Sequence, residues 1–583
     1  MRRFRPVFEI LARHRAALAL GFLCVLVTQA AHVAIPRVVQ GAVDALGAEP
    51  GPDLDAVAAA ALIVVGLALV RGGTQFAMRW LIVGVSRRME LALRQRVFEH
   101  LERLHFGWFD AARTGDVLSR ATQDVEAVRM PLGPGLMYLA NTSVAVPVSL
   151  VVMWGYSPRL TLLVLAPMLL TAVATKFLAP WVHRTSLRVQ EGQADLASRA
   201  QESFAGVRVV KSHGREAAEV DDFRAQGEEY SRRVLAHVKA RALMEPSFWL
   251  LEGAGMLLIL WVGGGMVVAG EMTVGEFVAF NLYNLLLLWP MIALGWVVAL
   301  MQRGAAAMDR INEVLDARPE VEDAPDAVPL PDPRGEVEFR DLTFSFGANP
   351  PVLREVSFRV PAGGCLAIIG PTGSGKSTLL SLLPRLYRLP DGKVFLDGHD
   401  VNRLRLADLR RALGVVPQET FLFSATVREN LAWGHDGGAP EGAVERAAEV
   451  ARLAPDLERF PDGMETLLGE RGVNLSGGQK QRAAIARALA LDPRVLLLDD
   501  CLSAVDAHTE EEILRNLRDA IRGRTTLLVS HRVAAVRHAD EILFLEGGRV
   551  VERGAHDALL ARGGRYAALA RLQRLEGEIE AVR

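Results

Sequence analysis

The chain has 583 residues, which is more than one compact domain usually contains. Half of the residues are hydrophobic and the mean hydropathy is +0.20, so we expect part of the chain to lie in a lipid bilayer. The 66 basic and 68 acidic residues almost balance, which argues against nucleic acid as a partner.

Six apolar runs in the first half are each long enough to cross a bilayer as a helix, which takes about 20 residues. We expect these spans at residues 16–35, 56–83, 135–156, 160–181, 248–269 and 277–301. One such run alone is equally typical of a buried core helix, but six in succession favour an α-helical transmembrane domain, here residues 1–315.

The loops between the expected spans alternate between short and long. Two long polar segments rich in arginine, residues 84–134 and 183–246, separate the second span from the third and the fourth from the fifth. Basic residues favour the cytosolic side of a membrane. We therefore expect a multi-pass protein of the cytoplasmic membrane. Its amino terminus, its long helical loops and everything after the sixth span would be cytosolic.

The expected spans contain charged residues, among them Arg71 and Glu252, whereas we expect Arg79 to lie deeper still and outside the lipid. At about 1.5 Å per helical residue, Arg71 lies roughly 22 Å and Glu252 roughly 27 Å from the outer end of its span, in the inner half of the bilayer. Each side chain either reaches the inner headgroups or lines a cavity that opens to the cytosol. Both alternatives stay open.

The second half of the chain has the pattern of a soluble domain. Residues 316–335 are rich in proline and acidic residues and have no apolar periodicity, which indicates an extended linker. From residue 336 to 583, short strand-like runs alternate with helical patterns, which predicts an α/β domain with a largely parallel sheet.

A glycine-rich stretch between a predicted strand and a predicted helix has the pattern G-x-x-x-x-G-K-S, which indicates a P-loop that binds ATP. Its glycines let backbone N–H groups close around phosphate oxygens, while Lys376 reaches the β and γ phosphates and Ser377 ligates Mg²⁺. The expected nucleotide-binding residues are Gly370, Pro371, Thr372, Gly373, Ser374, Gly375, Lys376, Ser377 and Thr378.

A second buried strand, residues 495–498, ends in Asp499. A carboxylate at the end of a strand beside the phosphate loop is typical of the group that holds Mg²⁺. The sequence therefore predicts Asp499 as a metal ligand together with Ser377.

Further motifs give the chain a family resemblance. Leu475, Ser476, Gly477, Gly478 and Gln479 precede a helical pattern and resemble the signature of ATP-binding cassette (ABC) ATPases. Residues 415–419 resemble the Q-loop of that family, which makes Gln418 a contact of Mg²⁺ and water. His531 resembles the switch histidine. The stretch Ser503, Ala504, Val505 and Asp506 resembles the D-loop.

The first half resembles ABC exporters of the multidrug and lipid A flippase type in residues 105–129 and 201–223. The resemblance implies a half-transporter that works as a dimer, with coupling helices around residues 115–119 and 212–219. It also implies that each signature motif contacts ATP bound to the partner chain. The transported substrate would be a small amphipathic molecule, a lipid or a peptide, and the fold does not decide among them.

Two positions depart from the family pattern. Phe346 replaces the usual tyrosine that stacks on adenine, and it keeps an aromatic ring. Asp500 replaces the usual catalytic glutamate and is one methylene shorter. Since a displacement of about 1 Å can slow a reaction about 100-fold, we expect this chain to bind ATP and Mg²⁺ but to hydrolyse ATP slowly. The expected catalytic residues are Asp500, His531 and Gln418.

This departure favours a heterodimer in which a non-identical half-transporter chain supplies a catalytic glutamate. Two alternatives remain open. One is a homodimer in which Asp500 acts as the base, and the other is an ATP-gated regulator or channel built on the same fold.

Overall fold

The computed structural model describes residues 2–48, 51–435, 437–501, 513, 515–516 and 522–582. Its internal contacts divide the chain into two units. The first contains Met1–Glu99 and Leu118–Leu315, and the second contains His100–Val117 and Asp316–Arg583. The segment His100–Val117 therefore belongs by its contacts to the carboxy-terminal unit, although it lies within the amino-terminal half of the sequence.

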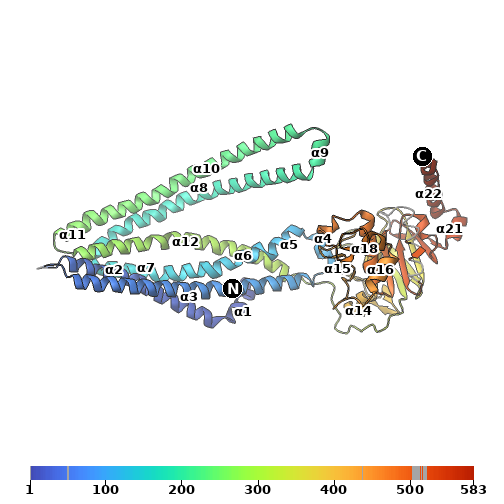
Figure 1. The fold of residues 1–583 in the computed structure, drawn as a ribbon, viewed down its shortest axis with the longest axis horizontal. Helices are drawn as coiled ribbons and strands as arrows, with labels where there is room; N and C mark the ends of the chain where they lie inside the picture. The colour runs from blue at the N-terminus through green and yellow to red at the C-terminus, as the bar shows by residue number, and fades with distance from the viewer. Residues whose placement is uncertain are drawn as a thin grey trace. The chain divides into compact units, whose positions relative to one another are not determined.

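The first unit consists of long helices (Figure 1). They are α2 (Arg15–Leu46), α3 (Leu54–Leu101), α7 (Leu136–Tyr156), α8 (Pro158–Ala205), α10 (Glu216–Leu258) and α12 (Val274–Leu315). A shorter helix, α1 (Arg5–Ala12), precedes them, and others lie between them: α6 (Gln123–Met130), α9 (Val207–Ser212) and α11 (Gly264–Val268). Helices α3, α8 and α10 continue from the apolar runs into the long polar segments, as predicted, and short helices separated by turns make up most of the rest of these segments.

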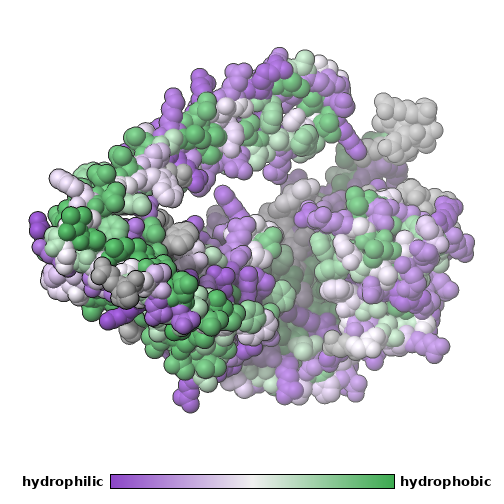
Figure 2. All heavy atoms as spheres, turned by 60° about the vertical axis from the view of Figure 1, so that its left-hand side comes forward, coloured by the Kyte–Doolittle hydropathy of each residue, from purple (hydrophilic) through white to green (hydrophobic). Residues whose placement is uncertain are grey.

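Five helical segments of the described chain are long and apolar enough to cross a membrane. They are Arg15–Leu46, Leu54–Leu101, Thr114–Tyr156, Pro158–Ala205 and Glu216–Val268. The sixth expected span lies in α12, where the described residues give a shorter apolar segment, Val274–Leu287. Figure 2 shows hydrophobic side chains gathered on the surface of this helical unit, where a soluble protein would carry polar ones.

Local signals in the sequence set the turn between α7 and α8. The Ser157 hydroxyl accepts a hydrogen bond from the Leu160 backbone N–H at 3.2 Å and so caps the amino terminus of α8. Pro158 occupies the first turn of α8, where the missing N–H of proline costs no hydrogen bond.

Buried contacts join the other helices of the first unit. The Tyr283 hydroxyl of α12 donates a hydrogen bond to the Val33 carbonyl of α2 at 2.6 Å, within a core that also contains Phe280 and Met153. The buried Asp124 carboxylate of α6 accepts two hydrogen bonds from the Arg310 guanidinium of α12. Helices α8 and α10 pack along each other and are joined by α9.

The second unit contains two sheets. A four-stranded antiparallel sheet has the order β2-β1-β4-β5, and a six-stranded sheet has the order β10-β9-β3-β8-β7-β6. The strands of the first are β1 (Val337–Phe344), β2 (Leu353–Val360), β4 (Val394–Leu396) and β5 (His399–Asp400). Those of the second are β3 (Cys365–Ile369), β6 (Leu413–Val416), β7 (Val495–Asp499), β8 (Thr525–Val529), β9 (Glu541–Glu546) and β10 (Arg549–Gly554).

All pairs of the six-stranded sheet except β9–β10 are parallel, which confirms the predicted α/β domain with a largely parallel sheet. The second unit also contains the helices α4 (Phe106–Ala111), α13 (Lys376–Leu382), α18 (Gly477–Ala490) and α22 (Arg565–Val582). In a parallel sheet the carboxyl ends of the strands meet at one edge, and loops from distant parts of the sequence converge there.

Candidate functional site

The nucleotide site predicted from the sequence lies at the carboxyl edge of the six-stranded sheet. Strand β8 pairs with β3 and β7 on its two sides, and Val529 lies opposite both Ile368 and Asp499. The loops that follow these three strands therefore line one cavity of about 250 Å³. Among its lining residues are Lys376, Ser377, Gln418, Asp499, Asp500 and His531.

The phosphate loop needs glycine at two positions for its shape. Gly373 and Gly375 have φ values of 78° and 101°, a region that residues with a side chain rarely adopt. A Cβ on Gly375 would also lie 2.8 Å from the Leu353 side chain, whereas a Cβ on Gly373 would meet no protein atom within 4 Å. The space beside Gly373 is open to a ligand.

The Lys376 ammonium group is buried at the base of this loop. It donates hydrogen bonds to the carbonyl oxygens of Gly370 and Pro371, each at 2.8 Å. Burial lowers the pKa of Lys376, and the carboxylates of Asp500 and Asp499 partly oppose this effect. The ammonium group therefore sits within reach of phosphates, held by backbone acceptors that a phosphate oxygen can replace.

The residues expected to hold Mg²⁺ lie together. The Ser377 hydroxyl donates a hydrogen bond to Asp499 Oδ1 at 3.0 Å, and Gln418 lines the same cavity after the end of β6. Hydroxyl, amide and carboxylate oxygens are the donors that Mg²⁺ prefers, so this set fits the ion. Burial raises the pKa of Asp499, while the Ser377 hydrogen bond opposes the increase.

Asp500 and His531 contact each other directly. Asp500 Oδ2 lies 2.6 Å from His531 Nε2, and the Asp500 side chain is 7% exposed while that of His531 is 46% exposed. The backbone at Asp500 has a φ of 45°, and its N–H donates to the Val529 carbonyl at 2.9 Å. The position of the carboxylate is therefore fixed by the sheet on one side and by the histidine on the other.

Gln573 is a contact of this site that the sequence reasoning missed. Its side-chain amide donates to the His531 carbonyl at 2.6 Å and accepts from the Val533 N–H at 2.8 Å. Gln573 lies in the carboxy-terminal helix α22, 42 residues beyond His531. No motif in the sequence marks a glutamine in such a helix, so only the tertiary contact identifies it.

The other predicted nucleotide contacts lie outside this cavity. The Phe346 ring follows β1 and packs edge-on against the Tyr387 ring, with 5.0 Å between the ring centroids. The signature residues Leu475–Gln479 stand at the start of α18, where the Ser476 and Gln479 side chains cap each other's backbone N–H. They do not line the cavity beside Lys376. The D-loop residues Ser503, Ala504, Val505 and Asp506 lie outside the described residues.

Tyr387 is also the point where the segment His100–Val117 contacts the carboxy-terminal unit. Its hydroxyl donates a hydrogen bond to Asp110 Oδ2 at 2.7 Å, and its ring packs edge-on against Phe106, with centroids 5.7 Å apart. Burial, followed by the Asp110 hydrogen bond, raises the pKa of Tyr387. Both partners are in α4, which precedes the predicted coupling position at residues 115–119.

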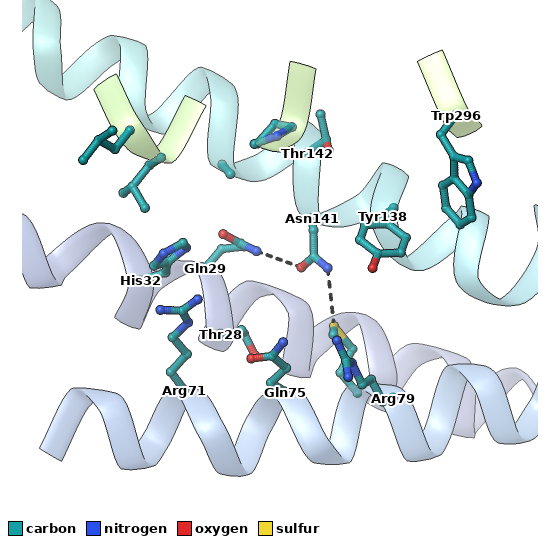
Figure 3. Close-up of a pocket in the computed structure, with 15 residues that line it drawn as sticks. Thr28, Gln29, His32, Arg71, Gln75, Arg79, Tyr138, Asn141, Thr142 and Trp296 are labelled. Atoms are coloured by element: carbon teal, nitrogen blue, oxygen red, sulfur yellow. Dashed lines mark hydrogen bonds between the residues drawn. The ribbon is translucent and has the colours of Figure 1, made fainter. Parts of the chain in front are cut away.

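A second cavity, of about 820 Å³, lies among the helices of the first unit. Its lining residues come from α2, α3, α7 and α12 and include Arg71, as Figure 3 shows. Glu252, on α10, is not among them. The cavity thus contains one of the two intramembrane charges that the sequence singled out, and it adds Arg79 and His32.

Family models match both halves of the chain. Residues 18–291 match the ABC transporter transmembrane region, and residues 353–503 match the ABC transporter family. Together the two matches place a membrane domain before an ATP-binding domain in one chain.

Curated proteins are similar to the chain over most of its length. The probable multidrug resistance ABC transporter ATP-binding/permease protein YheI of Bacillus subtilis (strain 168) is 37% identical over 83% of each chain. The multidrug resistance-like ATP-binding protein MdlA of Escherichia coli (strain K12) is 37% identical over 90% of this chain and 88% of its own. An ATP-dependent lipid A-core flippase of Syntrophus aciditrophicus (strain SB) is 31% identical over 99% of this chain and 95% of its own.

A solved structure also has a similar fold. The bacterial Atm1-family ABC exporter with ATP bound superimposes with a TM-score of 0.76 at 31% sequence identity, covering 96% of this chain and 98% of that one. The likeness therefore extends over both the helical and the α/β parts.

Proposed function

The chain belongs to the family of ABC exporter half-transporters, and from this premise we propose that it pairs with a different half-transporter chain and hydrolyses ATP slowly at its own site. Such exporters use ATP to export or flip their substrates across a membrane. In such a dimer each chain has its own ATP site, and we expect the partner's site to carry out most of the hydrolysis.

The observation that carries the proposal is the position of the Asp500 carboxylate. It lies 2.6 Å from His531 Nε2 and is buried, so it has little freedom to move toward a water molecule beside the γ phosphate. A general base must come within about 2.6–3.2 Å of the proton that it takes, directly or through one water. A glutamate would extend about one bond length farther from the same backbone.

The rest of the site retains the groups that bind ATP. Lys376 and the glycines of the phosphate loop bind and orient the phosphates, and Ser377, Asp499 and Gln418 would hold Mg²⁺. When bound, the ion neutralises charge on the β and γ phosphates. A site with these groups and a misplaced base should bind ATP and hydrolyse it slowly.

The signature motif supports a dimer. Leu475–Gln479 are intact, capped at the start of α18 and absent from the lining of this chain's own phosphate cavity. In this family that motif completes the site of the partner chain. The intact motif beside a shortened base supports an unequal pair in which this chain serves the hydrolytic site of a partner with a glutamate.

The orientation and the substrate are part of the proposal. The arginine-rich loops support a cytosolic amino terminus and a cytosolic ATPase domain in the cytoplasmic membrane. The substrate would be an amphipathic molecule, a lipid or a peptide, consistent with the multidrug and lipid names of the similar proteins.

The decisive experiment is purification of the chain from its native membrane, with mass spectrometry of the chains that copurify. The expected result is a second half-transporter in equal amount, with glutamate at the position of Asp500. A purified homodimer with full ATPase activity, which falls to background in the Asp500→Asn variant, would refute the proposal. ATP-dependent accumulation of substrate in inverted vesicles, without an accompanying current, would separate an exporter from an ATP-gated channel.

A further inference from the structure

The larger cavity of the first unit has a polar wall built from two helices. Arg71, Gln75 and Arg79 are spaced four residues apart on α3, so their side chains share one face of the helix. Gln29 and His32 of the neighbouring helix α2 lie beside the Arg71 side chain and belong to the same wall (Figure 3). All five residues lie in helices that are long and apolar enough to cross a membrane.

The charges of this wall are all of one sign. Within the described part of the chain, neither Arg71 nor Arg79 has an ion-pair partner, and no described lining residue is Asp or Glu. Arginine stays protonated in proteins, and a charged group in a membrane segment is costly unless it is paired or faces water. The two guanidinium groups therefore offer hydrogen-bond donors to an anion that the chain itself does not supply.

The amide of Gln29 gives an independent indication. Gln29 is 7% exposed, and its Nε2 donates a hydrogen bond to Asn141 Oδ1 at 2.8 Å. Its Oε1 is buried and has no hydrogen-bond partner among the described residues. Unsatisfied buried acceptors are rare in native proteins, so this oxygen is expected to accept a hydrogen bond from a ligand or a water molecule in the cavity.

Aromatic and apolar side chains form most of the remaining lining, together with Thr28, Asn141 and Thr142. Tyr138 and Trp296 pack edge-on with their ring centroids 5.3 Å apart, and Met78 and Leu285 also line the cavity. The cavity volume of about 820 Å³ is in the range of sites that bind drug-sized molecules. A ligand that fits both walls has a charged head and one compact apolar body.

We propose that this cavity binds the transported substrate and that the substrate is an amphiphile with an anionic head, such as an alkyl phosphate, and a single apolar chain or drug-sized body. The Arg71 and Arg79 guanidinium groups bind the anionic head, and the Tyr138–Trp296 side holds the apolar part. The identification as substrate rests on the proposed export function, whereas the binding preference does not.

The charge of the wall sets the selectivity. A lipophilic cation would bring its charge toward two guanidinium groups inside a medium of low dielectric, where like charges repel more strongly than in water. A guanidinium group also binds phosphate through two parallel hydrogen bonds, a geometry that a cation cannot use. Cationic amphiphiles, a common kind of drug, are therefore disfavoured here.

The test uses two amphiphiles of equal chain length and opposite charge, dodecyl phosphate and dodecyltrimethylammonium. The complete transporter, copurified with its partner, is placed in nanodiscs of zwitterionic phosphatidylcholine, and equilibrium binding is measured against empty nanodiscs. We expect dodecyl phosphate to bind at least tenfold more tightly than the cation. We expect this preference to fall at least tenfold in Arg71→Gln and Arg79→Gln.

Two further variants separate charge from folding. Arg88→Gln removes an exposed arginine from the same helix α3 and should leave the preference unchanged. Arg71→Lys keeps the charge but not the planar group, and it should keep part of the preference. Each variant is first shown to retain the thermal unfolding midpoint and the ATP affinity of the unmodified transporter.

Equal binding of the two amphiphiles, tighter binding of the cation, or a preference that survives Arg71→Gln and Arg79→Gln together would overturn the inference. ATP-driven uptake into proteoliposomes addresses the proposed function separately. Selective binding without uptake would refute export of this ligand and leave the site standing. Uptake of the cation alone would refute the anionic preference and leave the export function standing.

Discussion

Lengthening the side chain at position 500 is the most direct test of why this ATP site should be slow. An Asp500→Glu substitution adds one methylene, or roughly 1.5 Å of reach, to a carboxylate that now contacts His531 at 2.6 Å. A displacement of about 1 Å can change a rate about 100-fold, so we expect hydrolysis at this site to rise about 100-fold. That corresponds to about 2.7 kcal/mol of transition-state stabilisation.

The substitution should also lower the folding stability, and the backbone conformation at position 500 indicates by how much. Asp500 has a φ of 45°, a left-handed conformation that aspartate adopts more readily than glutamate. A longer residue there should cost on the order of 1 kcal/mol of folding stability. This cost is small against the roughly 5–15 kcal/mol by which folded domains are usually stable. The variant should therefore remain folded, with a slightly lower thermal unfolding midpoint.

The assay must report hydrolysis at this chain's own site. Photolabelling with 8-azido-ATP in the presence of vanadate traps the product nucleotide on the chain that formed it, so the label on this chain measures its own turnover. Asp500→Asn serves as the control, because it keeps the shape and removes the base, and it should change the trapped label little. The reasoning would be refuted if Asp500→Glu left the label unchanged, or if Asp500→Asn abolished hydrolysis that the unmodified chain performs well.

Three other substitutions test the contacts around the site. Asp499→Asn should abolish Mg²⁺-dependent ATP binding in an equilibrium assay. It should also raise the unfolding midpoint of the nucleotide-free protein at neutral pH, because burial raises the pKa of Asp499 and its charged form therefore disfavours folding above that pKa. In the unmodified protein, this loss of folding stability disappears as the pH falls through the raised pKa of Asp499. The affinity for Mg²⁺·ATP should weaken over the same pH range, because the carboxylate becomes protonated. A lower unfolding midpoint in Asp499→Asn than in the unmodified protein would contradict this reasoning. Tyr387→Phe removes the hydrogen bond to Asp110, which should lower stability by about 1 kcal/mol in denaturant titrations, and the loss should vanish in an Asp110→Ala background, which has no acceptor for the hydroxyl. Gln573→Ala releases the loop of His531 and should lower ATP turnover of the complete transporter without changing ATP affinity; reduced affinity would instead indicate general unfolding.

Much of the ATP site was predictable because it depends on residues close together in the chain. The glycine spacing before Lys376 and Ser377 follows from the backbone that a phosphate loop needs, and the structure has φ values of 78° and 101° at Gly373 and Gly375. A buried strand ending in Asp499 placed a carboxylate at an edge of the sheet. The long apolar runs likewise predicted the long helices, because a membrane-spanning helix must bury its backbone groups within itself.

The contacts between distant segments could not be read from the sequence. The strand order β3-β8-β7 brings His531 against Asp500, and this pairing depends on sheet topology. The same is true of Tyr387 with Asp110, which lie 277 residues apart, and of Gln573 with the His531 loop. None of these contacts has a local pattern, because side chains with no common motif meet only after the chain has folded.

The membrane cavity shows the same division between sequence and structure. The sequence alone identified Arg71 and Glu252 as unusual charges in apolar helices, since hydropathy is a local property. The packing of α2, α3, α7 and α12 decided which of them lines the cavity and which uncharged residues accompany it. The length of an apolar run determines that a helix forms and lies in lipid, whereas the rotation of each helix against its neighbours determines which polar side chains face one another.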